Sequence, residues 1–183
     1  MSASRRTTDE VSIHGLRLAF PRRSYLRPDV SDAYQQLSGR SVKNMDVWVA
    51  VDERVYFIEV TSSGTLKKHF HESGGGLRAL AEDLSQRVMH TLLLLGAGLS
   101  GVEPAAAVVR GHARDLHGLR AKLVFLVAVG ANDPERVTTL KDLIVHCVRP
   151  ALAIYGLTER DVIVLTPEQA RTHERFPFLN CAS

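Results

Sequence analysis

The chain has 183 residues, of which 45% are hydrophobic and 23% are charged, and its formal net charge is +3. These values are ordinary for one globular domain that buries its own core, and no apolar run approaches the roughly 18 residues of a membrane span. The N-terminus lacks the apolar segment of a secretion signal, and the two cysteines, Cys147 and Cys181, form no disulfide framework. We therefore expect a cytoplasmic protein with no membrane partner.

The positive charge is concentrated toward the N-terminus. Residues 1–43 carry eight basic and four acidic side chains, so the rest of the chain is close to neutral. A basic segment ahead of a neutral body is typical of an electrostatic handle for nucleic acid, and a solvated tail is the alternative interpretation. We expect residues 1–12 to be a flexible tail and residues 13–183 to be a single α/β domain.

A β-hairpin is the clearest element of the first half. It follows an expected short strand over Ile13–Phe20 and a short helix that ends near Leu37. Asp46–Val51 and Arg54–Thr61 are rich in β-branched and aromatic residues and are separated by two polar residues. This composition predicts two antiparallel strands joined by a tight turn.

A long amphipathic helix is the next strong signal. Apolar residues recur at helical spacing over Leu77–Leu95, and the glycines Gly96 and Gly98 predict the end of that helix. The polar, glycine-rich stretch Ser62–Gly76 before it predicts a loop. Ala105–Arg110 fits either a strand or a short helix.

Two apolar runs in the last third predict strands buried on both faces, Lys122–Val129 and Asp161–Leu165. A helix is expected from Pro134 toward Arg149, and Thr166 is expected to cap a further helix. The order of elements predicts an α/β fold with a single mixed central sheet, built on an antiparallel β-hairpin core and flanked by helices.

The hairpin brings two carboxylates together. If its turn has two residues, Asp46 lies opposite Glu59, with Cβ atoms roughly 5 Å apart. Strand alternation places Glu59 and Thr61 on the face that also holds Val55 and Phe57. Opposed like charges need neutralisation, and oxygen ligands suit Mg²⁺ or Mn²⁺. Two alternatives remain: an arginine or a nearby lysine pairs with Glu59, or a longer turn separates the carboxylates.

The same residues resemble the core of the PD-(D/E)XK nuclease superfamily. That family places an aspartate on one strand and Glu-x-Lys on the next, as Asp46 and Glu59 do here, and a helix that often carries a glutamine follows, as Gln86 does. The resemblance implies a restriction-endonuclease-like fold and metal-dependent phosphodiester hydrolysis, with Asp46 and Glu59 as ligands of Mg²⁺ or Mn²⁺. The family's lysine falls at Thr61, so either a lysine from elsewhere, such as Lys67, reaches the site or the chemistry is lost.

The resemblance also implies which side chains serve the reaction and the nucleic acid. The catalytic set comprises Asp46, Glu59, Thr61 and Lys67. The nucleic-acid-binding set comprises Arg22, Arg23, Arg27, Arg40, Lys43, Lys68 and Gln86. Two other functions stay open. One is a catalytically inactive interaction subunit on the same fold, with a protein partner or a second copy of the chain, and the other is a Rossmann-like nucleotide- or effector-binding module.

Overall fold

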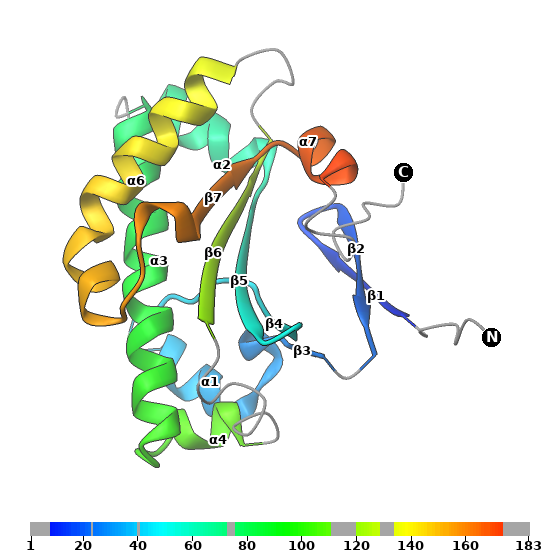
Figure 1. Ribbon diagram of the computed structural model, residues 1–183, viewed down its shortest axis with the longest axis vertical. Helices are drawn as coiled ribbons and strands as arrows, with labels where there is room; N and C mark the ends of the chain where they lie inside the picture. Colours follow the sequence, from blue (N-terminus) through cyan, green and yellow to red (C-terminus); the bar gives the residue numbers. More distant parts are fainter. Residues whose placement is uncertain are drawn as a thin grey trace.

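Two β-sheets and the helices packed against them make up the computed structural model (Figure 1). It describes residues 8–22, 24–39, 41–72, 76–110, 120–128 and 134–173. Over these ranges, no helix combines the length and the apolar character that crossing a membrane requires.

The smaller sheet is an N-terminal hairpin of β1 (Thr8–Ile13) and β2 (Leu16–Pro21). His14 and Gly15 form its turn with φ of 49° and 85°, the positive values that a tight hairpin of right-handed twist requires. The expectation of a flexible tail through residue 12 is therefore wrong from Thr8 onward. Val11 and Ile13 alternate with exposed neighbours and are buried, but the polar residues around them hide that alternation in the sequence.

The larger sheet begins with an antiparallel meander. Its elements are β3 (Tyr25–Leu26), η1 (Pro28–Val30), α1 (Asp32–Ser38), β4 (Val47–Val51) and β5 (Arg54–Thr61). The predicted hairpin is confirmed, because β4 and β5 pair antiparallel across a turn at Asp52 and Glu53. The short helix before it is also confirmed.

The segment after β5 is helical. It forms α2 (Ser63–Lys67) and a π-helical stretch, η2 (Lys68–Glu72), where the sequence predicted a loop. The Ser62 hydroxyl accepts a hydrogen bond from the Thr65 N–H at 3.2 Å and so caps α2.

The long helix, α3 (Gly76–Leu99), extends past its predicted end. It continues through Gly98, where an added Cβ would lie 2.8 Å from Val109 of α4 (Ala105–Val109). Gly98 therefore allows α3 and α4 to approach closely and does not end α3. Of the strand and the short helix that the sequence allowed over Ala105–Arg110, the structure has the helix.

The remaining elements follow the predicted order. They are β6 (Arg120–Val127), α6 (Pro134–Ile154), η3 (Glu159–Asp161), β7 (Val162–Leu165) and α7 (Pro167–Thr172). Thr166 caps α7 as expected, since its side chain accepts from the Gln169 N–H. Pro150 lies inside α6.

The strand order of the larger sheet is β3-β4-β5-β6-β7. The pairs β3–β4 and β4–β5 are antiparallel, whereas β5–β6 and β6–β7 are parallel. The prediction of a mixed sheet is thus confirmed, and this is not the all-parallel sheet of a Rossmann-like module. Helices α3 and α6 cover one face, and the β1–β2 hairpin lies on the other (Figure 1).

Candidate functional site

The register of the β4–β5 hairpin places Asp46 opposite Glu59. Val51 pairs with Arg54 and Val47 with Ile58, so the residue before β4 faces the one after Ile58. The predicted alternation also holds. Side chains of β5 in phase with Glu59 enter the core beneath α3 and α6, and those out of phase face the β1–β2 hairpin.

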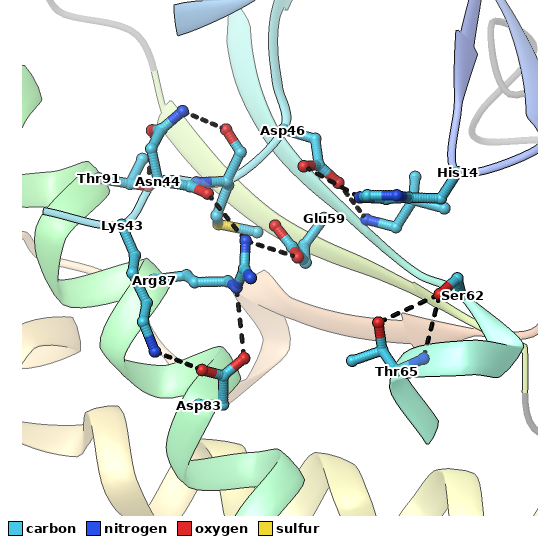
Figure 2. A network of polar contacts seen from close by, with 12 residues as sticks. His14, Lys43, Asn44, Asp46, Glu59, Ser62, Thr65, Asp83, Arg87 and Thr91 are labelled. Carbon is cyan, nitrogen blue, oxygen red and sulfur yellow. Dashed lines mark hydrogen bonds and ion pairs between the residues drawn. The ribbon is translucent and has the colours of Figure 1, made fainter. Parts of the chain in front are cut away.

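Glu59 is buried, with 3% of its surface exposed. Its Oε1 atom lies 3.2 Å from Nη1 of Arg87, which reaches the strand from α3 (Figure 2). Its Oε2 atom is buried and has no hydrogen-bond partner among the described residues. Burial, followed by the charge of Asp46, raises the pKa of Glu59 well above its ordinary value, and Arg87 opposes this shift.

Asp46 lies nearer the surface, with its side chain 18% exposed. Its Oδ2 atom accepts a hydrogen bond from the Val60 N–H at 2.9 Å. Its Oδ1 atom lies 3.8 Å from Nε2 of His14, at the tip of the β1–β2 hairpin (Figure 2). Burial raises the pKa of Asp46, although the Val60 hydrogen bond and His14 lower it. Burial thus disfavours the charged form of both carboxylates, and a positive charge between them would stabilise that form.

A third carboxylate, that of Asp83 on α3, holds the neighbouring cations. Asp83 accepts from Lys43 Nζ at 2.6 Å and from Arg87 Nε at 3.4 Å. Burial acts to raise the pKa of Asp83, but the Lys43 hydrogen bond and the charges of Arg87 and Lys43 outweigh it and lower that pKa. Lys43 is thus committed to Asp83, and Arg87 is shared between Asp83 and Glu59.

The charges at this site do not balance. Three carboxylates meet two permanent cations: Asp46, Glu59 and Asp83 against Lys43 and Arg87. Counting these carboxylates and cations alone, one negative formal charge remains, and the ion pairs leave it on the Asp46–Glu59 pair. Mg²⁺ commonly binds proteins through one or two carboxylates plus waters and substrate phosphates. The pair therefore fits a hard divalent cation, with Glu59 Oε2 as a free ligand atom. The described residues form no cluster of three or more side chains that could bind a metal.

Thr61 lies where the resemblance places it, but the expected lysines do not. Thr61 is buried on the same face of β5 as Glu59, and its Oγ1 atom has no partner among the residues described. Lys67 and Lys68 are exposed at the junction of α2 and η2, and neither forms an ion pair with the two carboxylates. The role of Lys67 at the site therefore stays a prediction.

Arg87 is the site residue that the sequence reasoning missed. The neighbouring Gln86 was expected there instead, and it is exposed on α3. The structure confirms the alternative in which an arginine pairs with Glu59. The i, i+4 spacing of Asp83 and Arg87 beside the apolar stripe of α3 is the signal that could have identified it.

The expected nucleic-acid-binding residues differ in their surroundings. Arg22 is exposed. Arg27 is engaged with Asp29 through two hydrogen bonds of 3.2 and 2.6 Å. Arg23 and Arg40 lie outside the described residues.

Comparison of the chain with protein-family models, with curated proteins and with solved structures finds no match. The chemistry of the site is therefore inferred from its own residues. They present two opposed carboxylates, a buried carboxylate oxygen with no partner in the described part of the chain and a guanidinium paired with Glu59, and this set suits a divalent cation.

Proposed function

We propose that this chain is a PD-(D/E)XK-like domain that acts on nucleic acid by metal-dependent phosphodiester hydrolysis. The observation that carries the proposal is the buried Oε2 atom of Glu59, which has no hydrogen-bond partner among the described residues and belongs to the residue that the hairpin register sets opposite Asp46. A buried carboxylate oxygen without a partner is costly, and Mg²⁺ or Mn²⁺ bound between the two carboxylates would satisfy it.

The order of elements around the pair supports this function. The strand that follows Asp46 pairs antiparallel with β5, which carries Glu59. Helix α3 then leads to β6, which pairs parallel with β5. This is the succession of aspartate strand, glutamate strand, helix and further strand that the resemblance implies.

Each side chain has a distinct role in this proposal. Asp46 and Glu59 would hold the cation, which when bound lowers the pKa of a water and offsets charge on the phosphate. Arg87 fixes the Glu59 carboxylate through Oε1 and leaves Oε2 for the cation. It also supplies the positive charge that Thr61 cannot. The Thr61 hydroxyl, on the same face, is available to orient a water.

The expected phosphate contacts are exposed basic residues at the surface. Arg22, Lys67 and Lys68 are exposed and would bind the nucleic-acid backbone through charge. Affinity that comes from such contacts falls steeply as the salt concentration rises.

A second candidate function is a catalytically inactive subunit that binds nucleic acid, a protein or a second copy of this chain. The ion pair between Arg87 and Glu59 favours it, because a guanidinium already neutralises part of the charge that a cation would offset. Thr61, which stands in place of the family's lysine, also favours an inactive subunit.

A nuclease assay with Mg²⁺ or Mn²⁺ tests the proposal on linear, circular and single-stranded substrates. We expect cleavage by the wild type and none by Glu59→Gln or Asp46→Asn. Glu82→Gln is the matched control, since Glu82 is an exposed α3 residue whose ion pair is with Arg78, and it should cleave like the wild type. Retarded migration of the substrate without cleavage by any variant would reject hydrolysis in favour of the second function.

A further inference from the structure

A cavity of about 410 Å³ lies on the same side of the larger sheet as Glu59, toward the opposite end of β5. Val55 lines it and precedes Glu59 by four residues in the same strand phase, which separates the two sites by about 13 Å. Phe57 lies between them and is fully buried. The cavity is thus separate from the carboxylate pair.

The walls of the cavity combine apolar and polar surface in similar proportion. Leu92 and Leu95 of α3 line it together with Leu157, which follows α6. Its volume falls within the range of small-molecule sites, which combine apolar walls with a few polar groups.

The wall at the end of α6 is held in a defined position. The Tyr155 hydroxyl donates a hydrogen bond of 2.8 Å to the carbonyl oxygen of Leu92. Gly96 makes room for this contact, because a Cβ at that position would lie 3.1 Å from the hydroxyl. The cavity is therefore bounded by α3, β5, β6 and the segment that follows α6.

The polar groups of the cavity leave one positive charge without a partner. Asp161 is satisfied, since it accepts from Lys122 at 2.5 Å and from the Thr158 N–H at 2.8 Å. Arg120 lines the cavity and is exposed, and it forms no ion pair within the described part of the chain. An anionic group would meet this guanidinium with complementary charge.

We propose that this cavity binds a small anionic molecule with a flat apolar body, such as an aromatic sulfonate or carboxylate. The apolar body would lie against Leu92, Leu95 and Leu157, and the anionic group would bind Arg120. Binding here does not depend on a cation at the Asp46–Glu59 pair.

Fluorescence titration with 1-anilinonaphthalene-8-sulfonate tests the proposal on the full chain. The wild type should bind one equivalent saturably, and uncharged N-phenyl-1-naphthylamine should bind about tenfold more weakly. Arg120→Gln should weaken sulfonate binding by about the same factor. Ala121→Leu adds volume to a residue that lines the cavity and should abolish binding of both probes.

Two controls separate this site from the rest of the surface. Arg149→Gln removes the same charge from an exposed position on α6 and should bind like the wild type. Glu59→Gln should also bind like the wild type, whatever its nuclease activity. Circular dichroism establishes that each variant is folded. Equal weakening by Arg120→Gln and Arg149→Gln, or unchanged binding by folded Ala121→Leu, would overturn the proposal.

Discussion

Glu59 combines a buried carboxylate with an ion-pair partner, Arg87. The ion pair satisfies one carboxylate oxygen, and the other has no hydrogen-bond partner among the described residues. Burying charge costs free energy that only pairing or hydrogen bonding recovers. Substitution of either residue removes the ion-pair partner of the other and should therefore lower the free energy of unfolding.

Arg87→Met should destabilise the fold, because it leaves Glu59 buried without its cation and removes one partner of Asp83. We expect a decrease in the free energy of unfolding of about 2 to 4 kcal/mol, measured by urea denaturation at neutral pH. Arg78→Met is the control, because Arg78 pairs with Glu82 on the exposed side of α3, and it should cost less than about 0.5 kcal/mol. Similar decreases in the free energy of unfolding for both variants would show that the Arg87–Glu59 ion pair stabilises the fold no more than an exposed pair does.

The raised pKa of Glu59 predicts a pH dependence of stability. The folded protein retains a proton at pH values where the unfolded chain, with an ordinary value of 4.5, has released it. Protonation therefore favours the folded state, and this contribution is full below the unfolded pKa and is lost as the pH rises through the folded pKa.

Glu59→Gln removes that titration. The free energy of unfolding of the wild type, relative to Glu59→Gln, should decrease between about pH 5 and about pH 8 without divalent cations. Urea denaturation of both proteins at the two pH values measures this difference. A difference that stays constant or grows with pH would contradict the raised pKa.

The opposition of Asp46 and Glu59 could be predicted from the sequence because a hairpin register depends on local turn length. Arg87 could not be predicted as the partner in the same way. Its contact depends on how α3 is rotated above the sheet, and tertiary packing decides that rotation. A shift of one residue along α3 exchanges the exposed Gln86 for the inward-reaching Arg87.

At the scale of elements, glycine was the least reliable indicator of helix ends and loops. It predicted an end for α3 that the structure does not have, because the packing of α3 against α4 uses Gly98 inside the helix. The glycine-rich composition of Ser62–Gly76 likewise hid α2 and η2, although Ser62 was available as a helix cap. Strands with dense apolar sequence were predicted closely, since burial on both faces leaves little ambiguity.

Gly98→Ala should destabilise the protein despite the higher helix propensity of alanine. The new Cβ would lie 2.8 Å from Val109 and 2.9 Å from the Ala105 carbonyl oxygen, and overpacking of this kind costs about 1 to 3 kcal/mol. Gly64→Ala is the matched control, because its Cβ would lie 3.6 Å from the Ser62 hydroxyl. In urea denaturation, Gly64→Ala should be neutral or stabilising, and an increase in stability for Gly98→Ala would contradict the packing role.

For the whole molecule, the N-terminal hairpin completes the fold. Leu18 and Phe20 of β2 are fully buried against the face of the large sheet that α3 and α6 do not cover. The same hairpin carries His14 to Asp46. A sheet with two apolar faces needs a packed layer on each face. The β1–β2 hairpin supplies the second layer, and the polar residues around β1 are the reason that the sequence predicted a tail there.

Ile13→Ala tests whether β1 belongs to the folded core. Ile13 is 5% exposed, so truncation should lower the free energy of unfolding by about 2 to 4 kcal/mol. Ser12→Ala, at the exposed position next to it, should change that free energy by less than about 0.5 kcal/mol. Chemical denaturation that gives the same stability for both variants would show that β1 does not pack in the folded core.

Binding of a divalent cation by Asp46 and Glu59 is the central claim, and isothermal titration calorimetry with Mn²⁺ tests it most directly. The wild type and Glu82→Gln should each bind Mn²⁺ at one saturable site, whereas folded Glu59→Gln and Asp46→Asn should lose that site. Absence of binding in the wild type, or equal binding in all four proteins, would contradict the claim and leave Glu59 as the partner of Arg87 alone.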